Sequence, residues 1–390
     1  MEVKMKEYSH IVFRKNWEID NDISYMLGQC DSIVRTISVV PISPAYFSYL
    51  MSVSLKKGAI ATTAIEGNTL SEEEVERIHQ GDSLPPSKKY MEMEILNIKD
   101  ALNGIKNDVL VKGVDLLISR ELIEEYHRMV GRNLGDQFEA IPGKFRHHDV
   151  VVGSYRAPKH QDVPELVGRL CNWLRSEFLY EQGKQEFSDQ IIQAIVTHVY
   201  IAMIHPFGDG NGRTARLLEF YILLRAGLPI VASHILSNHY NDTRSEYYRK
   251  LDACRTSVSL TEFIRYAVQG FRDGLDEVLE TIINQQYDIS WKNYIYEILD
   301  SKKAQGKSRN IVKRRRELAL TVPVDKQSSI QEIMSRNFRL AQTYAQLTQE
   351  TLTRDIAELI RLELVLRKGR DYQGNIDIMK RMMPPRKVKE

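Results

Sequence analysis

The chain has 390 residues, of which 43% are hydrophobic and 27% are charged, and its formal net charge at pH 7 is +2. These values are those of an ordinary soluble protein with two or three domains. The sequence has neither an apolar run of about 18 residues nor an apolar segment directly after Met1, so we expect no membrane span and no secretory signal. A cytoplasmic protein that does not bind membranes is therefore expected.

The charge is unevenly distributed along the chain. Residues 301–390 contain 21 Lys and Arg but only 10 Asp and Glu, whereas the other 300 residues contain 33 basic and 42 acidic side chains. A basic C-terminal part on an acidic body suggests an anionic partner, such as nucleic acid. Cys30, Cys171 and Cys254 are far apart in the sequence, which favours buried thiols in a reducing compartment over a metal site.

Apolar residues recur at three- and four-residue spacing through most of the chain, which predicts a mostly α-helical protein. The predicted helices cover 21–38, 47–64, 72–80, 88–107, 115–131, 163–182, 188–204, 213–226, 243–254 and 260–286. Ser71 followed by Glu74 has the spacing of a capping box and marks the start of one helix. The β-branched run Val150–Gly153 interrupts the helices and predicts a short β-hairpin.

Two interruptions of the helical pattern, at 108–114 and at 302–312, divide the chain. They predict an N-terminal helical region (1–112), a core (113–286), a linker helix (287–310) and a C-terminal domain (311–390). In the last of these, helices at about 328–336, 340–347 and 350–362 precede strands at 365–368 and 376–378. This order of elements is that of a winged helix, which would serve DNA binding or protein docking.

A glycine-rich loop between two predicted helices carries the candidate site. Pro206 stops the first helix, and the turn that follows leads directly into the next one. Such a turn directs successive backbone N–H groups at an anion, and the natural anion is a phosphate. The residues of the loop are His205, Pro206, Phe207, Gly208, Asp209, Gly210, Asn211, Gly212, Arg213, Thr214, Ala215 and Arg216.

Four side chains of this loop suggest a reaction. Arg213 and Arg216 lie three residues apart, so both can reach one phosphate, which a guanidinium binds in a bidentate manner. Asp209 is the candidate ligand for Mg²⁺ between phosphates, and His205 is the candidate base for an incoming hydroxyl. The alternative is a plain turn with solvated arginines, against which the density of reactive groups argues.

The loop resembles the signature of the Fic family, His-Pro-Phe-x-Asp-Gly-Asn-Gly-Arg-x-x-Arg, with every fixed position filled. Gly143–Arg146 resembles the segment that precedes the family's flap, and Val150–Gly153 resembles the flap. Trp173 matches an aromatic position of the following helix, and Tyr247 with Tyr248 resembles the helix near the adenine. The resemblance covers roughly residues 20–285.

The resemblance implies a Fic-type helical core that transfers AMP from ATP to a Ser, Thr or Tyr hydroxyl of a protein. Under it, His205 is the catalytic base, Asp209 binds Mg²⁺, and Arg213 and Arg216 hold the β- and γ-phosphates. The protein substrate could be the chain itself, and a homodimer fits the family. The implied nucleotide-binding residues are Phe207, Gly208, Asp209, Gly210, Asn211, Gly212, Arg213, Arg216 and Tyr248, with Phe207 as a packing anchor.

A second motif, Thr62–Gly67, resembles the family's N-terminal inhibitory helix, Ser/Thr-x-x-x-Glu-Gly/Asn. The resemblance implies that Thr62 and Glu66 are inhibitory, with Glu66 paired to Arg216 so that the γ-phosphate cannot bind. A carboxylate suits this role because it shares the charge and the bidentate geometry of a phosphate. The alternative is that Glu66 is an ordinary helix-terminal residue ahead of Gly67, a common helix stop.

Other functions stay open at this point. Relatives of the fold transfer phosphate, UMP or phosphocholine, and some remove AMP. Outside enzymes, the chain could be a DNA-binding regulator in which the nucleotide site is a sensor. The basic run at 311–316 favours nucleic acid, whereas the mixed charge of the 350–362 helix does not. His198 and the run His147–Asp149 offer metal-ligand types, but a packing histidine and a solvated turn are expected there.

Overall fold

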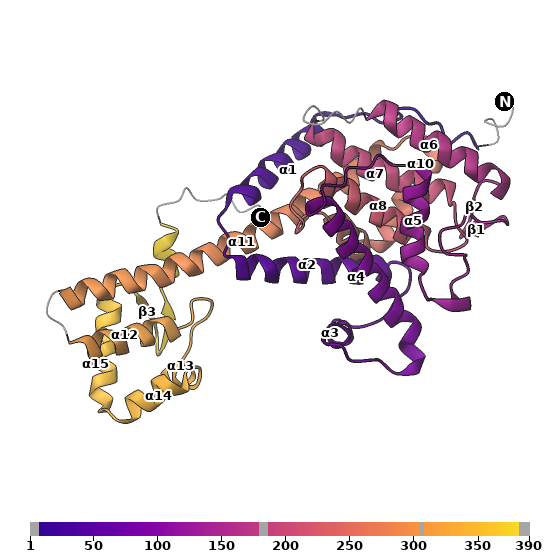
Figure 1. Ribbon diagram of the computed structural model, residues 1–390. Helices are drawn as coiled ribbons and strands as arrows, with labels where there is room; N and C mark the ends of the chain where they lie inside the picture. Colours follow the sequence, from indigo (N-terminus) through magenta and orange to yellow (C-terminus); the bar gives the residue numbers. More distant parts are fainter. Residues whose placement is uncertain (1–7, 179–185, 305–307, 382–390) are drawn as a thin grey trace. The chain divides into compact units, whose positions relative to one another are not determined.

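The structure is a computed structural model that describes residues 8–178, 186–304 and 308–381. The chain forms two compact units, Met1–Leu279 and Glu280–Glu390 (Figure 1). The described residues are mostly helical and include two small two-stranded sheets, so the mostly α prediction is confirmed. Unit 1 contains the predicted N-terminal region and the predicted core as far as Leu279, seven residues short of its expected end at 286. The boundary between the two at residue 113 stays a prediction.

The centre of unit 1 is a pair of packed helices, α7 (Phe187–Ile204) and α8 (Asn211–Arg225). Most side chains of α7 and nearly all of those of α8 are buried, because both helices are surrounded by other elements. By length and composition α7 is the one helix of the described part that could cross a membrane, with a mean hydropathy of 1.3. Since 72% of it is buried inside the unit, it is a core helix here.

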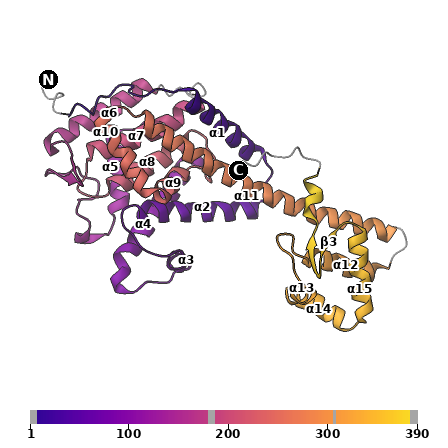
Figure 2. The ribbon, with the colours of Figure 1, turned by 180° about the vertical axis from the view of Figure 1, so that it is seen from behind.

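The other helices of unit 1 surround this pair. Helices α4 and α5 pack on α8, α1 and α6 pack on α7, and α2 packs on α4 and on α9, as Figure 2 shows from behind. Their bounds are α1 Asn21–Val39, α2 Pro44–Ala64, α3 Glu72–Gln80, α4 Lys89–Leu110, α5 Arg120–Gly131, α6 Val163–Glu177, α9 Ile235–Asp242, α10 Arg244–Ser257 and α11 Thr261–Ala304.

Helix ends follow local capping. Ser71 caps α3 and forms the predicted capping box, with both reciprocal hydrogen bonds to Glu74 present. The start predicted at residue 115 is wrong: α5 begins at Arg120, because the Ser119 hydroxyl accepts from the N–H of Leu122 at 3.3 Å. Helix α9 was not predicted, since eight residues are too few for a clear periodicity. The predicted end of α6, at 179–182, lies outside the described residues.

The predicted hairpin is present as β1 (Val151–Val152) and β2 (Tyr155–Arg156). Its turn contains Gly153, whose φ of +58° lies in the left-handed region that favours glycine. Val151 is 60% exposed and Val152 is 40% exposed, and in the described part of the chain β1 pairs only with β2. The outer edge of β1 is therefore free for another strand.

Unit 2 contains the end of α11 followed by α12 (Arg309–Thr321), α13 (Ile330–Ser335), α14 (Phe338–Ala345), α15 (Gln349–Arg361), β3 (Val365–Lys368) and β4 (Asp371–Gly374). The predicted linker helix 287–310 is not a separate element, because α11 continues to Ala304. Trp291, Ile295 and Leu299, spaced four residues apart on α11, enter the core of unit 2.

The C-terminal hairpin corrects one prediction. The strand expected at 376–378 is wrong: Ile376–Met379 is a 3₁₀ turn, and β4 is its neighbour Asp371–Gly374. Gly369, at φ +65°, lets the chain reverse over two residues, so Lys368 pairs directly with Asp371. The order helix, helix, helix, hairpin is present, and the assignment of a winged helix stays a prediction.

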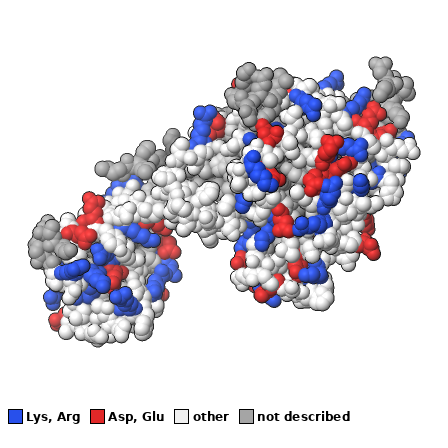
Figure 3. Space-filling view, viewed as in Figure 1, with Lys and Arg blue, Asp and Glu red and all other residues white. Residues whose placement is uncertain are grey.

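The basic run of α12 is largely committed inside unit 2. Arg314 and Arg315 each donate at 2.7 Å to the carboxylate of Asp355, which is 1% exposed. Arg316 lies 3.3 Å from Asp300. Figure 3 shows Lys and Arg side chains over one face of this unit, with Asp and Glu between them. The arginines of the 311–316 run therefore stabilise the unit. Because their charges are paired there, the run favours nucleic-acid binding less than the sequence alone indicated.

Candidate active site

The loop predicted to carry the chemistry joins α7 to α8. His205 ends α7 with φ 50° and ψ 61°, a left-handed conformation that is uncommon for a non-glycine residue. The Asn211 side chain then closes the loop: it accepts from the N–H of Phe207 and donates to the Phe207 carbonyl, both at 2.9 Å. Because both ends of its amide are used, Asn211 shapes the loop in this structure rather than extending toward a ligand.

Phe207 is fully buried and stacks on His127, with ring centroids 3.6 Å apart. His127 accepts at Nδ1 from the N–H of Gly143 and donates from Nε2 to the carbonyl of Asp209, both at 2.9 Å. Burial lowers the pKa of His127 to about 4, so the ring is neutral at pH 7, as these two bonds require. Sequence reasoning missed His127, although its place between Ile123 and Val130 on the apolar face of α5 is a signal.

At two glycines of the loop, neighbouring atoms lie too close to leave room for a Cβ. A Cβ at residue 208 would lie 2.3 Å from the carbonyl oxygen of Glu139, so Gly208 serves packing. A Cβ at residue 212 would lie 2.2 Å from Oε1 of Glu66. The carboxylate of Glu66 therefore lies directly against the first turn of α8, where backbone N–H groups and the helix dipole favour an anion.

His205 is half-buried beside this anion site. Burial lowers its pKa to about 4, and the cation of Arg146 acts in the same direction, while Glu66 and Asp209 oppose it. The imidazole is therefore neutral at pH 7. A neutral imidazole can accept a proton from a hydroxyl, which is the chemistry predicted for this residue.

Arg213 is held between two carboxylates. It donates to Asp209 at 2.8 Å and forms a close ion pair with Glu94, which is buried on α4. Burial raises the pKa of Glu94 against the opposing effect of Arg213. Sequence reasoning missed Glu94, although an acid beside Ile95 on the buried face of an amphipathic helix could have identified it. Arg213 must exchange a carboxylate for a phosphate if it binds nucleotide.

Arg216 is 1% exposed and donates through Nη2 to Oε1 of Glu66 at 2.5 Å and to the carbonyl of Thr62 at 2.9 Å. The two predicted inhibitory residues therefore do meet Arg216, but Thr62 does so through its backbone. Burial raises the pKa of Glu66, yet the charge of Arg216 and its hydrogen bond outweigh burial, so the net pKa is lowered. Among the described residues, none bonds to Nε or Nη1 of Arg216.

Tyr248, the residue expected near the adenine, is 45% exposed and lies close to the inhibitory motif. Its hydroxyl donates to the carbonyl of Ile65 at 3.2 Å, directly before Glu66. The neighbouring Tyr247 is buried and bonds to His198, which also lies 2.9 Å from Glu219. His198 is thus a packing histidine, as expected.

The residues fit a nucleotide with a single metal ion. Asp209 accepts two hydrogen bonds at Oδ1, from Gly210 and Arg213, and no described residue donates to its Oδ2. The described residues contain no cluster of three or more His, Cys, Asp or Glu that could hold a metal. One available carboxylate oxygen suits Mg²⁺, which in phosphate sites is held by few carboxylates together with phosphates and water.

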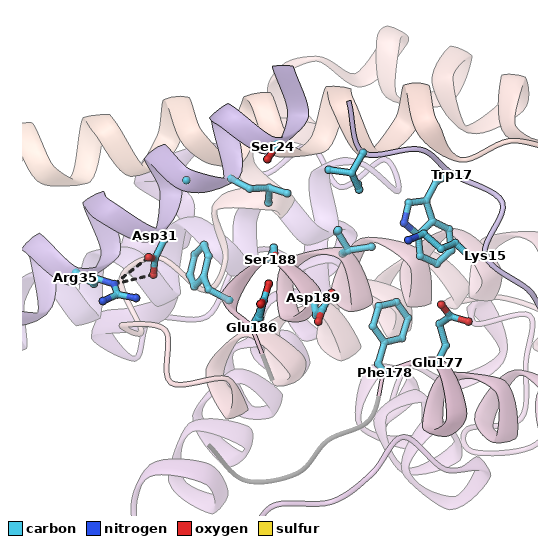
Figure 4. Close-up of a pocket in the computed structure, with 15 residues that line it drawn as sticks. Lys15, Trp17, Ser24, Asp31, Arg35, Glu177, Phe178, Glu186, Ser188 and Asp189 are labelled. Carbon is cyan, nitrogen blue, oxygen red and sulfur yellow. Dashed lines mark hydrogen bonds and ion pairs between the residues drawn. The ribbon is translucent and has the colours of Figure 1, made fainter. Parts of the chain in front are cut away.

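One groove of unit 1 lies apart from this site. It has a volume of about 660 Å³ and lies between the N-terminal segment, α1 and the adjoining ends of α6 and α7 (Figure 4). Trp17 and Phe178 stack in it, and Asp31 pairs with Arg35 at one side. None of the predicted site residues lines it.

Comparison with known proteins identifies the region that contains the loop. Residues 117–223 match the model of the Fic/DOC family. The chain carries a Fic domain. The match includes α5, the β1–β2 hairpin, α7 and most of α8, and so covers the signature loop but not Glu66.

The Fic domain has curated relatives. Protein adenylyltransferase fic-1 of Caenorhabditis elegans is 32% identical over 209 residues, which are 53% of this chain and 38% of that protein. Protein adenylyltransferase Fic of Nematostella vectensis is 29% identical over 239 residues, which are 61% of this chain and 50% of that protein. The chain therefore spans half or less of the length of these relatives.

Solved structures agree with the Fic-type fold. Fic-1 of C. elegans superposes with a TM-score of 0.52 at 26% identity, covering 67% of this chain and 73% of that one. A Fic family protein from Desulfovibrio desulfuricans superposes with a TM-score of 0.57 at 18% identity, covering 93% and 98%. The second likeness, at this low identity, supports the fold alone.

Proposed function

We propose that this protein transfers AMP from ATP to a Ser, Thr or Tyr hydroxyl of a protein, and that Glu66 holds the reaction off. The names of the relatives support the activity. The observation that carries the inhibition is the position of the Glu66 carboxylate, bonded to Arg216 and in contact with Gly212 at the amino end of α8.

In the proposed reaction, the target hydroxyl gives its proton to the neutral imidazole of His205 while its oxygen attacks the α-phosphorus. A new oxygen–phosphorus bond forms on the target. The bond from the α-phosphorus to the bridging oxygen breaks, and pyrophosphate leaves with that electron pair. Asp209 would hold Mg²⁺, which neutralises the phosphate charge when bound, and Arg213 and Arg216 would hold the outer phosphates.

Inhibition follows from competition for one anion site. The γ-phosphate needs Arg216, whose Nη2 now binds Glu66 and Thr62. The Glu66 carboxylate also lies against Gly212, so a phosphate cradled by that backbone would meet it. With the outer phosphates displaced, the α-phosphorus is not aligned for attack. A charge-assisted hydrogen bond contributes about 1.5–3 kcal/mol, which corresponds to roughly 10- to 150-fold inhibition.

The test uses ATP labelled on the α- or the γ-phosphate, with Mg²⁺ and the full-length chain. Wild type, Glu66→Gly and Glu66→Gly/His205→Ala are compared, with Glu73→Gly on α3 as the matched control. We expect α-label alone on protein, strongest in Glu66→Gly, lost in the double variant and unchanged in the control. Equal α-label in wild type and Glu66→Gly would contradict the inhibition.

The same experiment separates the other donors. Label from the γ-phosphate would indicate phosphate transfer, and no label from either position would direct attention to UMP or phosphocholine donors. AMP removal is tested by adding wild type and Mg²⁺ to protein already labelled by Glu66→Gly. Loss of the label would show that the wild-type chain removes AMP.

A second candidate function is nucleic-acid binding by unit 2. The hairpin residues Arg367, Lys368 and Arg370 are exposed and follow three helices, as in a winged helix. Their charges suit phosphate contacts, which weaken steeply with salt. Duplex DNA should shift in a gel with the full chain at low salt, and less with all three residues changed to Ala. No shift at low salt would remove this candidate.

The protein substrate could be the chain itself, which the labelling experiment would show as label on the enzyme. A homodimer and a cytoplasmic location fit the proposed enzyme, and light scattering of the purified chain tests the first of these.

A further inference from the structure

Arg146, five residues before β1, is a buried cation at the junction between the β1–β2 hairpin and the signature loop. Its side chain is fully buried. Its guanidinium donates to the carbonyls of His205 (2.8 Å), His148 (2.9 Å) and Pro158. The backbone N–H of Arg146 donates to the carbonyl of Pro206 at 3.0 Å. The nearest carboxylate oxygen, on Asp149, is 3.8 Å away. The donors of this cation therefore bind backbone oxygens from three separate segments.

Those three segments have different roles. His148 and Pro158 flank the β1–β2 hairpin on its two sides, and His205 carries the candidate base. One planar guanidinium thus fixes both ends of the hairpin relative to the backbone of the base. An Arg side chain suits this task because its donors are held in a rigid plane, whereas a Lys ammonium is a single flexible point.

Tyr155 on β2 provides a second connection to the same helix end. Its hydroxyl donates to the carbonyl of Met203 at 2.7 Å, two residues before His205, and lies 2.9 Å from Nε2 of His10. The guanidinium of Arg255 lies 4.0 Å above its ring. The hairpin is therefore fastened through β2, while the edge of β1 stays exposed.

We propose that Arg146 and Tyr155 are positioning residues that set the distance between a target strand on the edge of β1 and the imidazole of His205. This proposal rests on the proposed function, in which a target hydroxyl meets His205. A strand that pairs with β1 inherits the position of the hairpin. Arg146 holds the carbonyl of His205 and Tyr155 holds that of Met203, so the two connections fix both partners of the proton transfer.

The kinetic test uses Glu66→Gly as the parent and adds Arg146→Lys or Tyr155→Phe. Arg169→Lys on α6 and Tyr25→Phe on α1 are the matched controls, because both side chains are surface groups outside the loop. We measure the rate of α-label transfer to protein at saturating ATP and the Kd for ATP by calorimetry. We expect each positioning variant to lower the rate by about tenfold or more, because misplacement by about 1 Å is costly, with Kd within about twofold.

A structural readout separates this proposal from the proposed function. Hydrogen exchange followed by mass spectrometry should show faster exchange in both 147–158 and 203–209 in Tyr155→Phe and Arg146→Lys, and in neither control. If the parent transfers no α-label but the two segments loosen together, AMP transfer fails and the coupling stands. Transfer rates within twofold of the parent, a Kd that rises in parallel with the loss of rate, or loosening of only one segment would each overturn the proposal.

Discussion

One nitrogen of Arg216, Nη2, donates to the carboxylate of Glu66 at 2.5 Å although the two residues are 150 positions apart. The pair joins the turn that follows α2 to the second turn of α8. Since Arg216 is 1% exposed, loss of the carboxylate leaves a buried cation with a carbonyl as its partner. The pair therefore contributes to stability as well as to the proposed inhibition.

Removal of Glu66 should consequently destabilise the free protein. We expect Glu66→Gly to lower the free energy of unfolding by about 2 kcal/mol. This is less than the typical loss for a fully buried ion pair, because the side chain of Glu66 is 28% exposed. MgATP should raise the Tm of this variant more than that of wild type, because phosphate replaces the carboxylate. Thermal unfolding with and without MgATP measures both effects, with Glu66→Gln as the control that keeps an acceptor. Equal ligand shifts in all three proteins would contradict the competition.

Loss of the Tyr248 hydroxyl should weaken inhibition slightly. In Tyr248→Phe the ring remains, but the hydrogen bond to the carbonyl of Ile65 is lost. This loss should destabilise the inhibited state by about 1 kcal/mol. Basal α-label transfer should rise by about fivefold in the wild-type background. The effect should vanish in Glu66→Gly, where no inhibitory carboxylate remains. A rise of the same size in both backgrounds would place the effect of Tyr248 on the nucleotide instead.

Acidification should destabilise the protein before its carboxylates titrate. Burial lowers the pKa of both His127 and His234 to about 4, below the ordinary value of 6.5. The unfolded chain then binds protons more strongly than the folded one, so stability is complete above about pH 6.5 and falls as the pH drops toward 4. By pH 5 each histidine should cost about 2 kcal/mol. Urea unfolding between pH 7.5 and 5 measures this, and His127→Gln should flatten the dependence.

Unit 2 should depend on the buried carboxylate of Asp355. Burial raises its pKa, but the hydrogen bonds from Arg314 and Arg315 outweigh burial and lower it. Asp355→Asn removes the charge at nearly constant volume and should destabilise this unit by about 3 kcal/mol. The exposed Asp377→Asn on the last turn is the control. Proteolysis of unit 2 in urea measures the loss, and equal resistance of both variants would show that the arginines find other partners.

The sequence allowed the prediction of the elements that local patterns determine. The loop from His205 to Arg216, the Ser71 capping box and the hairpin at Val151 all follow from short-range rules of glycine, proline and capping chemistry. The helical class follows from periodicity. The proximity of Glu66 and Arg216 had no local signal, and it was expected only because the motif around Glu66 resembles an inhibitory helix.

The parts that escaped prediction depend on tertiary contacts. Glu94 and His127 look like ordinary helix residues until α4 and α5 pack against the loop and give them Arg213 and Phe207 as neighbours. The basic run at Arg314 looks like a nucleic-acid contact until α15 brings Asp355 beneath it. Spacing along one helix cannot show which residue of another helix will face it, and these assignments therefore required the structure.

The left-handed backbone of His205 has a consequence for how this position tolerates change. An L-residue at φ 50° costs roughly 1–2 kcal/mol relative to glycine, which adopts this conformation freely. A chain with glycine at position 205 would relax this turn and lose its proton acceptor in the same substitution. The substitution would raise the stability of the fold and abolish the proposed reaction. The histidine at position 205 is therefore explained by the reaction and not by the stability of the protein.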